Sequence, residues 1–157
     1  MKHFLIIAII FNIIVAAKEL KIVANSFHAD EKIGVSVFEG NVMITKGNDE
    51  LNASKVTVYT DANNKPTKFV ALGKASFKIE TVEGAKYKGK ANKVIFYPMK
   101  KEYHFFQNVH LNQINEKKEI IGDEVILKTV DGTAYAKGLK KEPVIMIFNI
   151  EDEEEKK

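Results

Sequence analysis

Apolar and polar residues alternate with a period of two along most of the chain after residue 20. One extended segment places Val42 and Ile44 on one face, and another places Val56 and Val58 on one face, with the polar Thr57 between them. This alternation is typical of β-strands that have one buried and one solvated face. No amphipathic helix is predicted after residue 17, so the pattern favours an all-β domain with about a dozen or more short antiparallel strands.

Clusters of turn-forming residues separate the apolar segments. They are rich in the Gly, Pro, Asn and Asp residues that tight turns favour. They are the stretches KGND (46–49), DANNKP (61–66), VEG (82–84), PMKK (98–101), NEKK (115–118) and VDG (130–132). We expect each of them to connect two neighbouring strands.

A repeat of about 33 residues runs through the middle of the chain, with copies spanning 40–72, 73–106 and 107–139. Each copy opens on a similar segment (GNVMI, GKASF or QNVHL) and continues with a second one (ASKVTVY, ANKVIFY or GDEVILK). Stacked two-strand units form an elongated structure with free end strands. We therefore expect an open apolar trough that suits a lipidic ligand, and unpaired end strands that suit strand-to-strand docking.

The two ends of the chain differ from its body. Residues 1–17 read MKHFLIIAIIFNIIVAA, a basic start followed by an apolar run and by small residues before Lys18. This form predicts a secretory signal peptide cleaved after Ala17, because a membrane-spanning helix needs about 20 apolar residues. Residues 151–157 read EDEEEKK and predict an acidic, disordered tail, which leaves residues 18–150 as the folded domain.

The composition sharpens this picture through the residue types that are missing. The chain has no Cys, no Trp and no Arg, so all 24 basic residues are Lys. No disulfide, thiol nucleophile or thiolate metal site can form. The formal net charge of +3 is too small to indicate a nucleic-acid partner. Residues 18–150 alone carry 21 Lys and 16 acidic residues, a modestly basic body whose cations are all Lys point charges and not bidentate Arg groups.

Patterns for catalysis or metal binding are weak. His28, His104 and His110 are predicted to be surface or rim residues, because a metal pair on one strand favours a spacing of two. Asp123 and Glu124 are adjacent and face opposite sides of a strand, which prevents a paired-carboxylate site. The sequence has no GxSxG motif, phosphate-binding loop or GxGxxG motif. We therefore expect no enzyme activity, no metal and no cofactor.

Six segments occur in an order and spacing that are specific as a set. They are FEGNVMIT (38–45), LNASKVTVY (51–59), VALGKASFK (70–78), KGKANKVIFY (88–97), FFQNVHLNQ (105–113) and IIGDEVIL (120–127). Together with the predicted signal peptide, they resemble the OstA-like N-terminal domain family of LptA-type lipopolysaccharide-transport bridge proteins over residues 20–148. One departure is Gln107, which stands where the other copies have Gly40 and Gly73 and which we do not expect to disturb the fold.

The resemblance implies an open, twisted antiparallel β-jellyroll shaped like a bent taco, and the two-strand repeats suit such a fold. It implies a periplasmic protein without catalytic activity, whose apolar interior holds the acyl chains of lipopolysaccharide (its lipid A part) on the way from the inner to the outer membrane. Copies of the protein would dock end to end, edge strand on edge strand. The chain of copies would connect an LptC-like inner-membrane protein to an LptD-like outer-membrane protein.

The apolar stripe at period two supplies the candidate lipid-binding residues, and the first two also match the first strand of the family. The set is Leu20, Ile22, Val35, Val37, Val42, Ile44, Val56, Val58, Phe69, Phe77, Val94, Phe96, Phe105, Val109, Leu111, Val125 and Leu127. Candidates for contacts to phosphorylated headgroups at the rim of the trough are Lys55, Lys74, Lys78, Lys90 and Lys93. The last predicted strand, VIMIFNI, is the candidate docking edge, with Val144, Met146, Ile147 and Phe148 as its residues.

Three other interpretations stay open. The same fold could serve as a membrane-anchored, LptC-like component of the pathway with residues 4–17 retained. A purely structural β-protein could self-assemble without a lipid cargo. A periplasmic enzyme that acts on cell-envelope glycans is the third, and the weak catalytic patterns disfavour it.

Overall fold

The computed structural model describes residues 18–150, which form ten β-strands. Their bounds are β1 (Leu20–Val23), β2 (Ser26–Asp30), β3 (Val35–Lys46), β4 (Asp49–Thr60), β5 (Pro66–Glu80), β6 (Lys86–Tyr97), β7 (Glu102–Gln113), β8 (Lys118–Lys128), β9 (Thr133–Lys137) and β10 (Ile145–Phe148). Within this described range, no helix is present that is long and apolar enough to cross a membrane. The predicted signal peptide (1–17) and acidic tail (151–157) lie outside the described residues.

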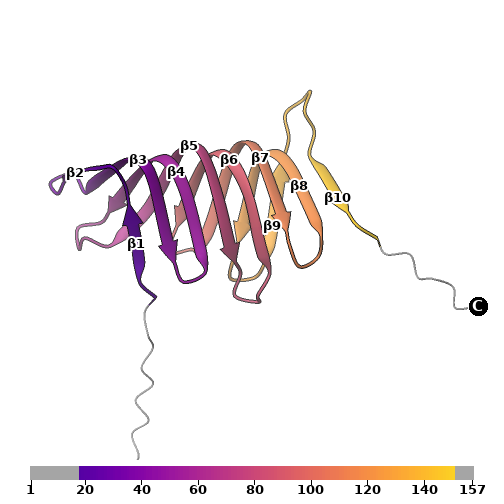
Figure 1. Ribbon diagram of the computed structural model, residues 1–157, viewed down its shortest axis with the longest axis horizontal. Coiled ribbons are helices and arrows are strands. Elements are labelled where there is room, and N and C mark those ends of the chain that lie inside the picture. The colour runs from indigo at the N-terminus through magenta and orange to yellow at the C-terminus, as the bar shows by residue number, and fades with distance from the viewer. Residues whose placement is uncertain (1–17, 151–157) are drawn as a thin grey trace, which may run out of the picture.

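All ten strands belong to one antiparallel sheet that winds along the long axis of the molecule (Figure 1). The strands from β3 to β8 pair in sequence order, each with the next. At one end β1 and β2 pair with successive parts of β3, and at the other end β9 and β10 pair with successive parts of β8. The strands at the two ends do not pair with each other, so the sheet is open, as the sequence predicts.

The long strands bend near their middles, and the bends fall where the repeats begin. In β3, β5 and β7 two consecutive residues have positive φ, and these pairs are Gly40–Asn41, Gly73–Lys74 and Gln107–Asn108. The register with the neighbouring strands shifts at the same places. A bulge of this kind kinks a strand and increases its twist, so the repeat seen in the sequence is a repeat of bends.

Gln107 adopts the conformation that the other repeats give to glycine. Its φ is 63°, against 81° for Gly40 and 87° for Gly73. A non-glycine residue in this region costs about 1–2 kcal/mol of backbone strain. The bend forms despite that strain, which confirms the prediction that Gln107 does not disturb the fold.

The bends fold the sheet into two layers that face each other, seen in Figure 1 as the front and rear halves of a flattened coil. The first layer holds β1, β10 and the segments 42–53, 75–91 and 109–121; the second layer holds β2, β9 and the segments 35–39, 55–72, 93–106 and 124–128. Phe77 of the first layer stacks on Phe105 of the second, with ring centroids 4.2 Å apart. One continuous cluster of buried apolar side chains fills the space between the layers.

The turn clusters that the sequence predicts each contain a connection between consecutive strands, which confirms them. The expected number of strands was too high, and their expected length too short. The two similar pieces of each repeat are joined across a bend or a turn into longer strands, of which β5 with 15 residues is the longest. A bend interrupts the alternation of apolar residues without ending the strand, and this is why sequence patterns alone divide it in two.

Candidate functional site

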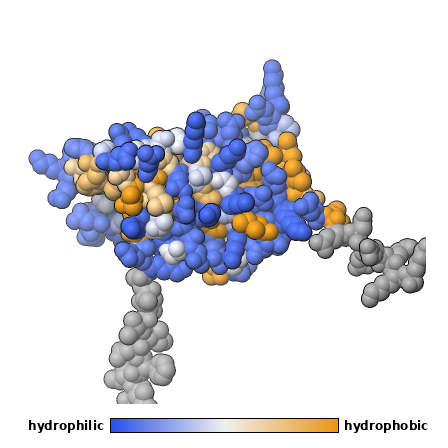
Figure 2. All heavy atoms as spheres, in the orientation of Figure 1, coloured by the Kyte–Doolittle hydropathy of each residue, from blue (hydrophilic) through white to orange (hydrophobic). Residues whose placement is uncertain are grey.

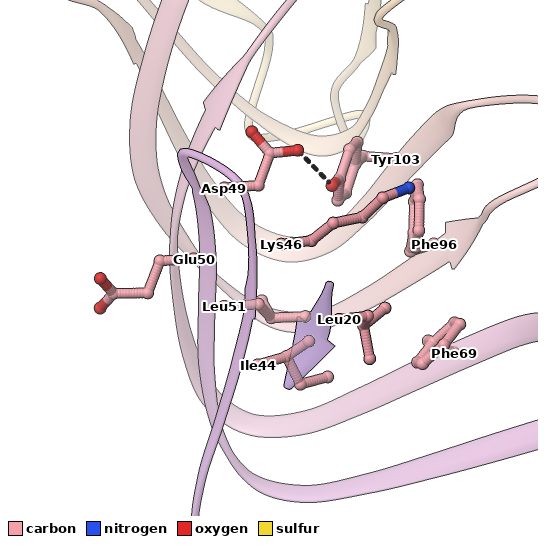
Figure 3. A pocket seen from close by; sticks show the side chains of 9 residues that line it. All are labelled: Leu20, Ile44, Lys46, Asp49, Glu50, Leu51, Phe69, Phe96 and Tyr103. Carbon is pink, nitrogen blue, oxygen red and sulfur yellow. Dashed lines mark hydrogen bonds between the residues drawn. The ribbon is translucent and has the colours of Figure 1, made fainter. Parts of the chain in front are cut away.

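A small hollow lies between the two layers near the N-terminal end of the molecule (Figure 3). Leu20, Ile44 and Leu51 line it from the first layer, and Phe69 and Phe96 line it from the second. Its volume of about 30 Å³ is far below the roughly 300–1,000 Å³ of pockets that hold organic ligands. A ligand with an acyl chain can therefore enter only if the layers separate.

Asp49 of the first layer binds Tyr103 of the second at the edge of this hollow. Its Oδ2 accepts a hydrogen bond of 3.1 Å from the Tyr103 hydroxyl, drawn as a dashed line in Figure 3, and its Oδ1 accepts one of 2.9 Å from the N–H of Glu80. Burial raises the pKa of Tyr103, and the adjacent Asp49 carboxylate raises it further. The hydroxyl therefore remains the donor over the whole physiological pH range.

A further hydrogen bond joins the layers along the side on which the turns lie, opposite the bends. We call this side the mouth; it is formed by the turns at 47–48, 81–85, 98–101 and 129–132. The N–H of Val82 in the first layer donates to the carbonyl of Thr129 in the second (3.0 Å). Within the second layer, the Thr129 hydroxyl donates to the carbonyl of Lys101 (2.8 Å), which connects two turns of the mouth. The layers can separate along the mouth only when such bonds break.

A groove of about 520 Å³ runs along the mouth next to the hollow. Lys18 and Lys46 line it from the first layer, and Lys101 lines it from the second. The carboxylates of Asp49 and Glu80 also border it. The groove therefore combines charged side chains with direct access to the apolar interior.

The middle of the interior is filled by its own side chains. Val94, Phe105, Val109, Leu111 and Val125 have no exposed surface. Over this stretch the open trough that the sequence predicts is occupied by packed apolar side chains. The candidate lipid-binding residues here stabilise the fold in the absence of a ligand.

The interior becomes wider at the C-terminal end. A groove of about 480 Å³ there is lined by Ile120 and Met146 from the first layer and by Ala134 and Ala136 from the second. The alanines leave space because β9 brings no large side chain to the inner face opposite Met146. This end of the interior is therefore accessible, whereas the middle is not.

All the candidate lipid-binding residues except Val35 and Val37 lie on the inner face of the sheet. Val37 pairs with Thr57 on the outer face, so the assignment of these two valines to the inner stripe is wrong. The inner position belongs to Phe38, which pairs with the fully buried Val56. The inner face of β3 keeps its alternation across the bulge, so counting back in steps of two from Ile44 and Val42 leads to Phe38 and Ser36. The two valines instead form a short apolar stripe of their own on the outer face.

The five candidate rim lysines do not lie at the mouth, and their assignment to the rim is corrected. One of them, Lys74, belongs to the bend of β5. The other four alternate with inward-facing residues and therefore lie on the outer face; they are Lys55, Lys78, Lys90 and Lys93. Lys55, for example, has its Nζ 3.3 Å from Glu39 Oε1 on that outer face. The lysines at the mouth are others, at the ends of strands or in turns.

The candidate docking edge is a free edge of the sheet. β10 pairs only with β8 among the described residues, and its other side has no partner. Met146, Ile147 and Phe148 are each about half exposed, whereas Val144 precedes the strand and packs against the core. Figure 2 shows apolar side chains gathered at this end of the molecule, over β10. At the opposite end, β1 and β2 form the other free edge.

Sequence reasoning missed the residues at the mouth, although a signal for them exists. Lys46 continues the inner stripe of Val42 and Ile44 by one more step of two, and Asp49 begins the stripe that continues with Leu51. A polar residue at the end of an inner stripe lies where the interior meets solvent. Extending each stripe to the last residue of its strand would have identified both.

Histidines are potential metal ligands, and two of those on the strands of residues 18–150 lie beside a carboxylate. No group of three His, Asp or Glu side chains in that range could hold a metal ion. His104 Nε2 lies 3.1 Å from Glu102 Oε2, and this hydrogen bond lowers the pKa of the Glu102 carboxyl. His104 pairs with Ile95 on the outer face, away from the hollow. The second carboxylate contact is similar: His110 Nδ1 lies 3.4 Å from Glu119 Oε1.

Comparisons with known proteins agree with this geometry. A family model described as "LptA/(LptD N-terminal domain) LPS transport protein" matches residues 21–133. No functionally curated protein matches the sequence significantly. Among solved structures, the chain is similar to LptH from Pseudomonas aeruginosa, described as the LptA-homologous periplasmic component of the lipopolysaccharide transport device. The TM-score is 0.75 at 18% sequence identity, over 85% of this chain and 96% of that one, which confirms the jellyroll fold.

Proposed function

This chain belongs to the family of LptA and LptD N-terminal domain proteins of lipopolysaccharide transport, and from that premise we propose that it is a periplasmic carrier of lipopolysaccharide. In this role it binds the acyl chains of the lipid between its two layers and passes the lipid on toward the outer membrane. The transport is a binding and transfer process without a chemical step.

The observation that carries this proposal is the continuous apolar cluster between the two layers of a sheet that is not closed at either end. At the N-terminal end Leu20 and Ile44 line the hollow, and at the C-terminal end Met146 lines the wider groove. Burial of acyl chains contributes about 0.8 kcal/mol per CH₂ group, so a bound lipid does not leave readily into water. Transfer from one such interior to a similar one in contact with it avoids that cost.

Loading requires that the two layers move apart, because the hollow is smaller than an acyl chain. The links at the mouth are a few hydrogen bonds, whereas the bends on the opposite side are continuous backbone. The layers therefore open at the mouth, with the bends as the hinge. Acyl chains then occupy the space between inner side chains of the first layer, such as Ile44, and those of the second, such as Phe69 and Phe96.

Site-specific photo-crosslinking tests this function. Crosslinking residues at Ile44 and Phe96 face the hollow, and a third at Thr57 faces outward from the same sheet as a matched control. We expect lipopolysaccharide to be captured at the first two positions and not at the third. A folded protein that captures no lipopolysaccharide at Ile44 and Phe96, or that captures it equally at Thr57, contradicts the proposal.

We also propose that the protein acts as part of an end-to-end bridge. The unpaired side of β10 offers backbone N–H and C=O groups to another strand, and β1 and β2 offer the same at the opposite end. Copies of the chain, an LptC-like inner-membrane protein and an LptD-like outer-membrane protein are the proposed partners. Docking in this way makes the interiors of successive molecules continuous.

A charge on the docking edge tests the bridge. Ile147→Lys or Met146→Lys places a lysine on β10, and Met99→Lys replaces an exposed apolar side chain in a turn away from both edges. We expect the β10 variants to reduce self-association in sedimentation experiments and the Met99 variant to leave it unchanged. Unchanged assembly in the β10 variants contradicts docking through this edge.

A structural β-protein that self-assembles without lipid is the second candidate. The observation that favours it is the packed middle of the interior, where Phe105 and Leu111 have no exposed surface. Such a protein would assemble through its edges and fail the crosslinking test at Ile44 and Phe96. Loss of assembly without any lipid capture would thus select this candidate.

The anchored, LptC-like role depends on whether residues 1–17 are retained, and these lie outside the described residues. Sequencing the N-terminus of the protein recovered from both the periplasmic and the membrane fractions decides between the two roles. A start at Lys18 supports the soluble carrier and contradicts the anchored component. A start at Met1 in a membrane fraction supports the anchored component.

A further inference from the structure

Three lysines come together at the mouth from separate parts of the chain. Lys46 ends β3 and faces inward, and Figure 3 shows its side chain extended past the hollow toward Phe96. Lys18 lies beside it, because its side chain packs over Gly47, where an added Cβ would lie 2.9 Å from Lys18 Cδ. Lys101 lines the same groove from the turn between β6 and β7 in the second layer.

These lysines form no close ion pair with a carboxylate. In the range 18–150, none of the three forms an ion pair within 4.0 Å, whereas lysines such as Lys55 and Lys118 do. The two acidic side chains in the groove are occupied by neutral donors. Asp49 accepts hydrogen bonds from Tyr103 and from the backbone, and Glu80 accepts one of 3.1 Å from the amide of Asn48. The ammonium groups are therefore available to an external anion.

The position of the lysines fixes the kind of anion that fits. The groove and the hollow share Lys46, Asp49, Phe96 and Tyr103 among their linings, so the charged and apolar parts are adjacent. A free inorganic anion would use only the charged part. A ligand that carries a phosphate close to acyl chains would use both parts at once.

We propose that the groove at the mouth is a phosphate site for an acylated lipid, with Lys18, Lys46 and Lys101 as the groups that bind the phosphate. This inference rests on the proposed function and assigns its headgroup contacts. Lysines act here as mobile point charges, which suits a ligand that must move on along the protein. With Asp49 and Glu80 the groove has a formal charge of +1, and replacing two of the lysines by neutral residues makes it −1.

Charge removal with a matched control tests the site. The variant Lys46→Gln/Lys101→Gln removes two charges at the mouth, and Lys78→Gln/Lys90→Gln removes the same number from the outer face. Equilibrium binding of phosphorylated lipid A is compared with that of dephosphorylated lipid A, at low and high salt. We expect the mouth variant to bind phosphorylated lipid A about tenfold more weakly, with a smaller effect at high salt. Binding of dephosphorylated lipid A should be unchanged, as should all binding by the outer-face variant.

Three outcomes overturn the proposal. The first is an equal loss in the outer-face variant, because binding would then follow the net charge of the protein. The second is an equal loss for the dephosphorylated lipid, because the lysines would then act on the interior. The third is inorganic phosphate that binds at the mouth while lipid binding does not depend on the lysines. A protein that fails to bind either form of lipid A contradicts the proposed function itself, which separates that failure from the failure of this site.

Discussion

The middle of the molecule and its two ends use the same kind of inward apolar residue in different ways. In the middle, Phe105 has no exposed surface and stacks on Phe77 of the opposite layer. At the N-terminal end Phe27 packs against Phe38 with tilted rings but remains 62% exposed, and at the C-terminal end Phe148 is 55% exposed. Each end lacks the next strand that would cover its aromatic side chains.

This difference in exposure indicates that inward residues in the middle stabilise the fold, whereas those at the ends are available for binding. Only side chains with neighbours on every side contribute fully to the free energy of folding. The ends keep apolar surface exposed, which a soluble protein normally avoids unless that surface binds something. We therefore expect substitutions in the middle to reduce stability and substitutions at the ends to affect binding and assembly.

The largest effect should come from Phe105→Ala in the middle. Removing a fully buried aromatic ring leaves a cavity, and such changes cost about 3–5 kcal/mol in the free energy of unfolding. Urea denaturation followed by circular dichroism measures this. The matched change Phe27→Ala at the N-terminal end should cost less than about 1 kcal/mol. Equal losses in the two variants would remove the distinction between middle and end.

Gly89 tests how tightly the strands pack within the first layer. A Cβ on Gly89 would collide with the backbone carbonyl of His110 on β7, so Gly89→Ala should destabilise the protein by about 1–3 kcal/mol. Gly122 lies toward the C-terminal end, where the nearest atom to an added Cβ is the Lys137 carbonyl oxygen at 3.3 Å. We therefore expect Gly122→Ala to lower the melting temperature much less than Gly89→Ala when both variants are compared by thermal denaturation. A larger decrease for Gly122→Ala would contradict this account of packing.

The bond between Asp49 and Tyr103 lies at the boundary between the closed interior and the mouth. Tyr103→Phe removes one hydrogen bond to a carboxylate and should cost about 1 kcal/mol. Acyl-chain uptake by the variant should be faster, because the layers separate more easily. Stopped-flow measurement of lipid binding tests the rate, and an unchanged or slower rate would show that the layers do not open at this bond.

The same tyrosine predicts a pH dependence. Its pKa is raised above the ordinary value of 10.0, so the folded state favours the neutral hydroxyl. Its contribution to stability is fully present below about pH 10 and is lost as the pH rises further, by up to about 1.4 kcal/mol per pH unit. The Tyr103→Phe variant should therefore lose less of its free energy of unfolding above pH 10 than the unsubstituted protein does. If the free energy of unfolding changes with pH in the same way in both proteins, Tyr103 is not the group responsible.

The smallest effect on stability should come from Phe148→Ala at the C-terminal end. The ring contacts Lys118, whose Nζ lies 5.6 Å from the ring centroid, and is otherwise half exposed. The free energy of unfolding should change by about 0.5 kcal/mol or less. Self-association through β10 should nevertheless weaken in analytical ultracentrifugation. If Phe148→Ala lowers the free energy of unfolding and leaves self-association unchanged, Phe148 acts as a core residue and not as part of the docking edge.

The period-two alternation was sufficient to predict the strands, the turns and most of the inner face. It failed at Val35 and Val37 because these two valines alternate with Ser36 and so resemble an inner stripe, although they lie on the outer face. Steps of two counted back from Val42 would have identified Phe38 instead. The sequence did contain the position of the bulges, since Gly40 and Gly73 open their repeats, but Gln107 made the common conformation harder to recognise.

The site was harder to predict than the fold because it is made by contacts between distant segments. Asp49 and Tyr103 are 54 residues apart and meet only when the sheet folds onto itself. The lysines of the mouth are separated in the same way, and their charge pattern resembles that of any solvated lysine. The prediction of rim lysines was based on alternation alone, which identifies the outer face and not the mouth.

The bends also determine how a molecule of this type can change in size. Each repeat contains its own pair of left-handed residues, so curvature arises locally and not from contacts between the two ends of the chain. Adding or removing one repeat of two strands would change the length of the molecule by roughly 10 Å, since neighbouring strands lie about 4.7–4.9 Å apart. The distance that one copy spans is therefore adjustable in whole repeats, with both free edges and the paired layers retained at every length.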